Sequence, residues 1–490
     1  MQLFIRNPLY FIKIYFRTKV LFFIILTGIL LTIRCASSVE SDRLRISFFP
    51  TLITQPWLNV LIADHLNGFM GKINSADYLT YQLDWYCNTM EMDSISYSSY
   101  LRQFGQRIEL DVLVHVQIQS VSEDRCTVQL DYYHPEKKEP IVILRDSLDF
   151  LEYEPFFQRI IVKTLDILSS EVDSFPEYPI FETRLWEPYG WGKYYQLTGN
   201  IASAETFYRQ GISVDTNQIS LLKGLIQVLL EKASKLRSEG KYLEDFYFEI
   251  ERLIHRGIEI DSMDSELYRS LGNLYIQRGM WNKAEQALDK AYEIGKDDPL
   301  LYFNLSRLHP SRYDELGFKN KTELLERAIY LNPAFQLGWI ALAEDCYYRN
   351  RYDKTEEVYN RLLEIFPGSL DGLLGLGKLY MVQNDIVNII RTYENVLEIA
   401  PDYADAYYNL GIVYYKDHQD DVAIQFFKKA IEISNHADSH YYLGIVYRNR
   451  NELDQAIYHF RKRIELKNGT GDTFAEEARI HLYELLENEG

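Results

Sequence analysis

The stretch that decides the fold is residues 401–434, PDYADAYYNLGIVYYKDHQDDVAIQFFKKAIEIS. Read at helical period, it contains two amphipathic segments, Ala404–Lys416 and Asp421–Ile433, joined by a polar turn. A glycine in the middle of a helix is about 1 kcal/mol less favourable than alanine, so Gly411 needs a packing reason. Its missing side chain lets an aromatic such as Phe427 of the second segment lie against the backbone. One helical hairpin cannot bury both of its apolar faces, so it must stack on similar neighbours.

Copies of this pattern lie before and after it in the chain. Gly377 precedes Gly411 by 34 residues and Gly444 follows it by 33, and each of the three has a tyrosine three positions later. The small residues expected at these helix-packing positions are Gly192, Gly272, Ala343, Gly377, Gly411 and Gly444. Pro333, Pro367 and Pro401 each lie ten residues before the small residue of the next unit, where a helix should have stopped. The spacing and register resemble the tetratricopeptide repeat over roughly residues 185–467.

The resemblance implies a mostly α-helical chain, with an α-solenoid of about eight helical hairpins over residues 189–467. The second hairpin is stretched by an insertion around Lys232–Lys241, and residues 310–320 lengthen the turn of the fourth. Residues 468–490 form the end of the sequence. They contain a last helix, Thr473–Leu486, that is apolar on one face and charged on the other, as a cap of a solenoid should be.

The composition restricts the classes of function. The chain has 490 residues and a formal net charge of −19, which repels phosphate backbones and argues against nucleic-acid binding. Four scattered cysteines are too few for a disulfide framework or a zinc site. In an oxidising compartment Cys87 could pair with Cys126, whereas Cys346 occupies a core position of its repeat.

Residues 1–38 read as a targeting segment, either a signal peptide or a signal anchor. Val20–Ile33 is an unbroken apolar run of 14 residues behind a basic leader, short for a membrane-spanning helix and suited to a signal-peptide core. Three alternatives stay open: a signal cleaved near Ala36–Ser38, a lipid on Cys35, and an uncleaved signal anchor. All three place the rest of the chain across the membrane from the basic leader. We therefore expect an exported protein on the periplasmic side of the cell envelope, with membrane contact only through this segment or a lipid on Cys35.

Residues 39–172 read as a small α/β domain, joined to the repeats by a proline-containing linker at 173–188. The clearest signal is period-two alternation over residues 112–119 and 127–132, on either side of a polar turn, which predicts a hairpin with one buried face. The other expected elements are strands at Arg45–Phe49 and Ile141–Leu144 and helices at Trp57–Met70, Tyr97–Ile108 and Phe157–Leu168. Their order loosely resembles the small extracytoplasmic domains of the TolB amino-terminal or FlgO type.

The sequence offers little for catalysis. Ser220 and Lys223 match the SxxK pattern of penicillin-binding enzymes, but the companion motifs are missing. His436 and His440 share one helix face but lack a third ligand, so we interpret them as part of a solvated helix start. We therefore expect no catalytic residues, no metal and no cofactor. The alternative is an enzyme or small-molecule sensor with its site in residues 44–169.

What remains is protein recognition. In the tetratricopeptide family the first helix of each unit lines a groove, and its side chains there contact a partner protein. The side chains expected in that role are Tyr347, Tyr348, Tyr408, Ile412, Tyr415, Tyr441 and Ile445. Ordinary packing between repeats is the alternative for the same residues.

Arg269, Asn273 and Asn304 resemble part of a clamp for a peptide carboxylate. Leu337 and Ala341 stand where its two further cations should follow, so we reject that ligand. The sequence thus favours an extracytoplasmic scaffold that binds a partner protein through the groove of the repeats. A structural spacer with no groove ligand is a third possibility.

Overall fold

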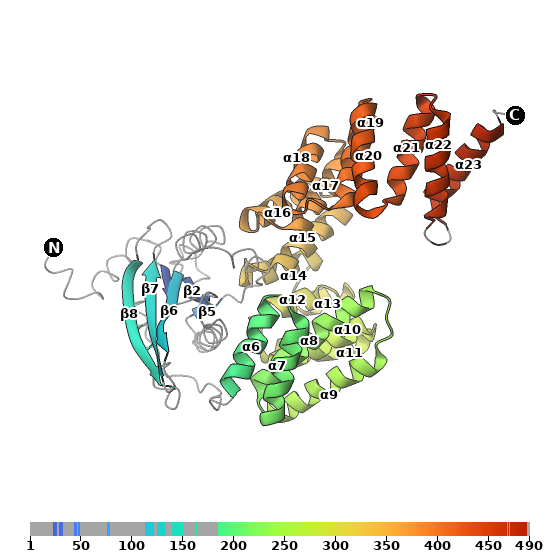
Figure 1. Cartoon of the computed structure of the whole chain (residues 1–490). Helices are drawn as coiled ribbons and strands as arrows, with labels where there is room; N and C mark the ends of the chain where they lie inside the picture. Colours follow the sequence, from blue (N-terminus) through green and yellow to red (C-terminus); the bar gives the residue numbers. More distant parts are fainter. Residues whose placement is uncertain are drawn as a thin grey trace. The chain divides into compact units, whose positions relative to one another are not determined.

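The computed structural model describes residues 23–26, 29–32, 44–46, 48–49, 76–78, 113–121, 125–133, 140–149, 160, 163, 185–467, 469 and 471–487. The chain divides into two compact units, Met1–Trp339 (unit 1) and Ile340–Gly490 (unit 2), and each is described by itself. Figure 1 shows strands at the amino-terminal end of the chain and paired helices after residue 185. Among the described residues, none of the helices combines the length and apolarity that a membrane crossing requires.

The strands of unit 1 form two sheets. The larger has the order β2-β1-β6-β7-β8, with β4 also pairing with β6, and in the smaller sheet β3 pairs with β5. The strands are β1 (Phe23–Leu26), β2 (Ile29–Thr32), β3 (Leu44–Ile46), β4 (Phe48–Phe49), β5 (Ala76–Tyr78), β6 (Leu113–Val121), β7 (Arg125–Tyr133) and β8 (Pro140–Asp149). β6, β7 and β8 pair antiparallel, while β3 with β5 and β4 with β6 pair parallel.

The structure confirms the predicted hairpin, because Val116 of β6 lies opposite Leu130 of β7 in an antiparallel ladder. β8 is longer than the four-residue strand expected there, and β5 was not predicted. Within the apolar run assigned to the leader, β1 and β2 pair with each other and β1 also pairs with β6. The remaining leader residues and the predicted helices at 57–70 and 97–108 lie outside the described residues, and of the helix predicted at 157–168 only Ile160 and Lys163 are described.

Four apolar residues in this part of the chain are almost completely buried. Cys126 and Val128 of β7, Leu148 of β8 and Ile160 are each at most 1% exposed. Burial raises the pKa of the Cys126 thiol to about 12, so it stays protonated and unreactive at neutral pH. It is a free thiol here, and Cys87, the partner considered for it, lies outside the described residues.

The rest of the described chain is helical, and successive helices pair as antiparallel hairpins (Figure 1). In unit 1 these are α6 (Trp186–Leu197) with α7 (Ile201–Val214), α8 (Ile219–Ser238) with α9 (Glu244–Ile260), α10 (Ser265–Gln277) with α11 (Trp281–Ile294), and α12 (Pro299–Leu305) with α14 (Lys321–Leu331), with α13 (Ser311–Glu315) between the last two. α15 (Gln336–Tyr348) begins in unit 1 and ends in unit 2. The helices that follow are α16 (Tyr352–Ile365), α17 (Leu370–Gln383), α18 (Ile386–Ile399), α19 (Ala404–Lys416), α20 (Asp420–Ser434), α21 (Ala437–Asn449), α22 (Leu453–Glu465) and α23 (Thr473–Glu487).

Polar side chains cap the start of several of these helices, and residues with a left-handed backbone occupy the turns that follow many of them. Asp264, Ser369 and Asp385 each accept a hydrogen bond from a backbone N–H in the first turn, as an N-cap should. The turns between paired helices need a left-handed residue, which is Gly199, Gly240 and Gly279 in unit 1 and Asn350, Asn384, His418 and Asn451 in unit 2. The predicted mostly helical fold is confirmed.

The expected small residues lie at the contact between the two helices of a hairpin. A Cβ on Gly411 would be 2.6 Å from the Phe427 ring, and Gly444 faces Phe460 at the same distance. The other contacts of this kind are Gly192 with Tyr208, Gly272 with Leu288 and Gly377 with Tyr393. In each case the partner is the residue sixteen positions later, and Ala343, the one alanine of the set, is fully buried. The small residue therefore lets the two helices approach until a large side chain touches the backbone.

Replacing Gly411 with valine is expected to lower the free energy of unfolding by about 1–3 kcal/mol, because the new side chain would overlap the fully buried Phe427 ring. Urea denaturation followed by circular dichroism measures the change. The double variant Gly411→Val/Phe427→Leu should lose less than the two single variants added together, since the smaller side chain makes room. Strict additivity would show that the two positions do not share this contact.

Candidate functional site

Three tyrosines on the first helices of two neighbouring hairpins in unit 2 gather into one group. The Tyr442 ring of α21 lies 5.9 Å from the Tyr408 ring and 5.8 Å from the Tyr415 ring, both on α19. Tyr442 also stacks on Phe427 of α20, with ring centroids 5.5 Å apart. We call Tyr408, Tyr415 and Tyr442 the tyrosine cluster. All three side chains are partly buried, so the cluster extends from the apolar core to the solvent-exposed surface of the first helices.

Sequence reasoning missed Tyr442, the residue at the centre of the cluster. It lies two positions before Gly444, where the neighbouring units carry Asn409 and Gly375. Aligning the units by their glycines would have marked a large ring at a position that is otherwise small or polar.

A second aromatic group lies at the end of α15. The rings of Tyr347 and Tyr348 have centroids 5.6 Å apart, and the Lys378 ammonium of α17 lies 4.8 Å and 5.4 Å from them. Tyr348 is 71% exposed, more than any other large hydrophobic side chain described in unit 2. A cation held over two rings is a stable local arrangement that still presents an open aromatic surface. We call Tyr347, Tyr348 and Lys378 the tyrosine–lysine group.

Three other predicted contact residues are packing residues in the structure. Ile412 is 7% exposed, and Tyr441 and Ile445 are each 8% exposed, within one apolar cluster of unit 2. The Tyr441 hydroxyl donates a hydrogen bond to Glu477 of α23 at 2.7 Å. These three residues therefore pack between repeats, which was the alternative to partner contact. Too little of each side chain is exposed to contact a partner.

Burial also affects the protonation of two residues of the tyrosine cluster, Tyr408 and Tyr442. It raises the pKa of Tyr408, with smaller effects from Tyr442 and Asp438. The pKa of Tyr442 is raised mainly by burial and then by Tyr415. These phenols therefore remain protonated across the physiological range and can act as hydrogen-bond donors.

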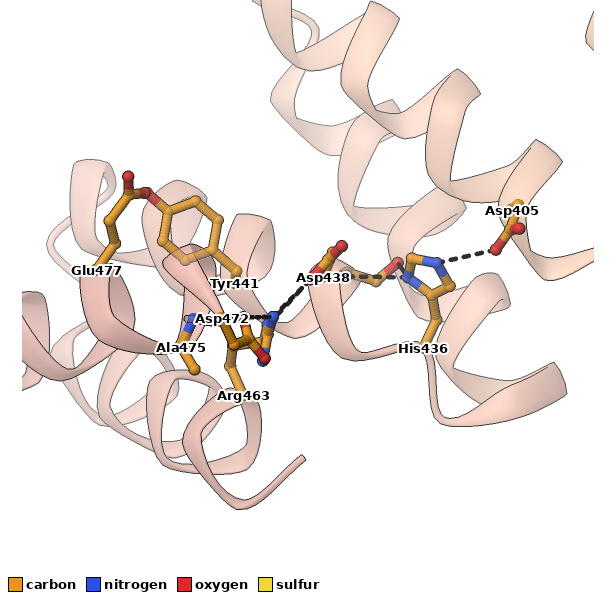
Figure 2. A network of polar contacts seen from close by, with 9 residues as sticks. Asp405, His436, Asp438, Tyr441, Arg463, Asp472, Ala475 and Glu477 are labelled. Atoms are coloured by element: carbon orange, nitrogen blue, oxygen red, sulfur yellow. Dashed lines mark hydrogen bonds and ion pairs between the residues drawn. The ribbon is translucent and has the colours of Figure 1, made fainter. Parts of the chain in front are cut away.

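A chain of polar contacts runs beside this apolar region, as Figure 2 shows. Arg463 of α22 is 4% exposed; its guanidinium donates to Asp438 of α21 at 3.0 Å and contacts both oxygens of Asp472, at 2.9 and 2.5 Å. Asp472 in turn accepts from the backbone N–H of Ala475, in the first turn of α23. The buried guanidinium of Arg463 therefore links α22 to α21 and to the start of α23.

The two histidines considered as metal ligands do not act together. His436 caps α21 by accepting from the backbone N–H of Ser439, and its other ring nitrogen lies 3.1 Å from Asp405. The interpretation of His440 as part of a solvated helix start is wrong. This residue is 3% exposed and its Nδ1 lies 2.8 Å from Nδ1 of His459. Within the described residues no group of three or more His, Cys, Asp or Glu side chains could hold a metal ion.

In unit 1 the partial clamp is occupied by the protein itself. Arg269 is 5% exposed and forms ion pairs with Glu266 and Asp298, at 3.3 and 2.5 Å. Asn304 is also buried. A partner carboxylate would have to displace these acids from Arg269, which agrees with rejecting that ligand.

Comparison with known proteins finds matches to one repeat family in parts of the helical region. Models described as "Tetratricopeptide repeat" match residues 267–302 and 404–436, and one described as "TPR repeat" matches residues 390–417. Among curated proteins, the human protein O-mannosyl-transferase TMTC1 is 24% identical over 179 residues. That match covers 36% of this chain and 19% of the human protein, so the chain spans about a fifth of its relative's length.

Solved structures of several proteins are similar to parts of this chain. Yeast Tom70 is 14% identical with a TM-score of 0.40, covering 67% of this chain and 74% of that one. Pseudomonas aeruginosa pilF is 19% identical with a TM-score of 0.35, covering 45% and 98%. A structure of MamA is 27% identical with a TM-score of 0.26, covering 30% and 94%. Together with the matching family models, the sixteen-residue packing contacts of the hairpins lead to one conclusion: this chain contains tetratricopeptide repeats, which the family models match at residues 267–302 and 390–436.

Proposed function

We propose that this chain is an extracytoplasmic scaffold that binds a partner protein through the first helices of unit 2. The observation that carries the proposal is the pair of aromatic groups on those helices, the tyrosine cluster and the tyrosine–lysine group. Tyrosine supplies a large contact area with few rotatable bonds and adds a polar hydroxyl, which suits it to protein interfaces. The partner segment that fits is apolar, with carbonyl or carboxylate groups to accept from the tyrosine hydroxyls and to meet Lys378.

Replacing Tyr348 and Tyr415 together with alanine is expected to reduce partner capture about tenfold or more, because both rings are accessible and belong to the two aromatic groups. The measurement is a cross-linking pull-down from membranes with quantification by mass spectrometry. Tyr458→Ala is the matched control, since Tyr458 is 52% exposed but lies on α22, a second helix. Equal capture by the double variant and the control would refute the assignment of this face.

The extracytoplasmic part of the proposal rests on the basic leader and the apolar run at Val20–Ile33. Cell fractionation tests it separately from partner binding. Recovery of the intact chain in the cytosol would refute export and leave the binding proposal standing. We propose no glycosyl transfer, because the match to the mannosyl-transferase covers only 19% of that protein.

A further inference from the structure

The last described helix, α23, leaves an apolar face uncovered. Ile480, Tyr483 and Leu486 are 57%, 62% and 40% exposed. The opposite face, with Ala478 and Leu485, belongs to the apolar cluster of unit 2 and packs on α21 and α22. The end of a repeat array usually carries a polar outer surface. α23 therefore presents more apolar surface than an end that faces only water needs.

The position of Ile480 within the repeat indicates what kind of surface this is. Leu379, Val413 and Val446 lie at the same position of three successive first helices, 34 and 33 residues apart. Ile480 follows Val446 by 34 residues, at the same position of α23. The three earlier residues are at most 3% exposed, and a further first helix follows each of them. Ile480 thus keeps an apolar side chain at a position that is buried where the array continues.

The same face is complementary to itself in charge. Arg479 and Glu487 lie four residues before and after Tyr483. Ile480 and Leu486 lie three residues before and after it. Residues three and four apart are neighbours on a helix surface, so all five belong to one face. In an antiparallel pair of α23 helices with a twofold axis at Tyr483, Arg479 would lie level with Glu487 of the second copy.

Both members of that charge pair are accessible. The Arg479 side chain is 42% exposed, and its Nη1 donates to Glu476 at 2.6 Å. The guanidinium has further N–H donors for a second carboxylate. Glu487 is exposed. In the same arrangement Ile480 would lie level with Leu486 of the second copy, so an apolar layer would lie beside each charge pair.

We propose that α23 is a self-association surface through which two copies of this chain pair antiparallel, with Tyr483 on the twofold axis. The chain carries a formal net charge of −19, so two copies repel each other and the attraction has to come from this face. One helix from each copy makes a smaller contact than a standard protein interface, so we expect a dissociation constant on the order of 10 μM. The surface is separate from the tyrosine cluster and the tyrosine–lysine group and does not depend on the partner proposed for them.

Sedimentation velocity of the full-length chain between about 1 and about 100 μM measures the association. Arg479→Glu is expected to raise the dissociation constant about tenfold, because it sets two glutamates against each other at both ends of the contact. The reversed pair Arg479→Glu/Glu487→Arg should restore the native value, and Tyr483→Glu should abolish association. Tyr458→Glu, which changes a tyrosine of α22 that is 52% exposed, is the matched control and should associate like the native chain.

All of the changed side chains are at least partly exposed, so each variant should keep the circular dichroism of the native chain. A native chain that is monomeric over the whole range overturns the proposal, and the face would then belong to a different protein or to another segment of this chain. Association that survives Tyr483→Glu places the contact elsewhere and also overturns it. If Arg479→Glu weakens association but the reversed pair does not recover it, the two residues do not meet across the axis and the proposed pairing is wrong.

Discussion

Replacing Arg463 with methionine is expected to destabilise the end of the helical array by about 3–5 kcal/mol. The change keeps much of the side-chain volume but removes the cation that lies between Asp438 and Asp472. Asp472 is itself 8% exposed at its side chain, so its carboxylate would be left buried without its partner. The same carboxylate caps α23 through Ala475, so the start of that helix would loosen as well.

Hydrogen exchange measured by mass spectrometry is the appropriate readout, because repeat arrays open locally and a single unfolding midpoint averages over them. Protection should fall in peptides from α21, α22 and α23 and stay unchanged in α16 and α17. Arg461→Met is the matched control, since Arg461 lies two residues away on α22 and is exposed. The loss of protection in Arg463→Lys should be intermediate between the losses in Arg463→Met and Arg461→Met. An ammonium cannot contact both oxygens of Asp472 as the guanidinium fork does. Unchanged protection in Arg463→Met would contradict the role given to this residue.

Acidification is expected to destabilise the same region between about pH 6.5 and pH 4. Burial lowers the pKa of both His440 and His459 to about 4. The unfolded chain takes up protons as the pH falls below about 6.5, whereas the folded chain takes them up only near 4. The unfolded state therefore binds more protons in this window, and stability falls as the pH falls. Each site contributes on the order of 3 kcal/mol when the full shift applies.

The contact between the two rings explains why protonation is unfavourable. Asn435 Oδ1 lies 3.2 Å from His440 Nε2 and accepts its hydrogen, so neutral His440 presents Nδ1 as an acceptor to His459 Nδ1–H. A proton on His440 Nδ1 would set two donors against each other. The nearby charges on Lys462 and Lys428 add to the effect, while Glu465 opposes it at His440.

Urea denaturation at several pH values measures this dependence. Other groups titrate in the same range, so the informative quantity is the difference between the native chain and the double variant His440→Leu/His459→Leu. The variant should show a smaller loss of stability between pH 6.5 and 4. Parallel curves for the two proteins would mean that the histidine pair makes no contribution.

The sequence was sufficient for the repeats because their signal is both periodic and redundant. Gly377, Gly411 and Gly444 recur in register. A side chain at these positions would collide with Tyr393, Phe427 and Phe460, respectively. The β6–β7 hairpin was equally accessible, since alternation on both sides of a polar turn has one simple interpretation.

Side-chain exposure was harder to predict than helix position. The side chain of a first-helix residue can face the second helix of its own hairpin, the next repeat or solvent. A shift of one position along the helix changes which of the three it faces. Tyr348 and Tyr441 were assigned the same role, yet one is 71% exposed and the other 8%. His440 looked like part of a solvated helix start because its partner, His459, lies on the next helix and cannot be found by spacing along one helix.

Short apolar segments were ambiguous for a different reason. A run such as Val20–Ile33 fits a signal core, a buried helix or paired strands, because periodicity does not separate these structures. In the structure Phe23–Leu26 and Ile29–Thr32 are paired strands. β5 has only three residues, too few to show alternation. The export of the chain therefore stays a prediction from the charges of the leader.

The sixteen-residue separation between each glycine and the large side chain it contacts bears on how the array forms. Contacts this local in sequence require little loop closure, so any hairpin can assemble early and serve as a template for the next. A polypeptide emerging from a ribosome or a translocation channel could therefore order its helices one pair at a time, well before synthesis is complete.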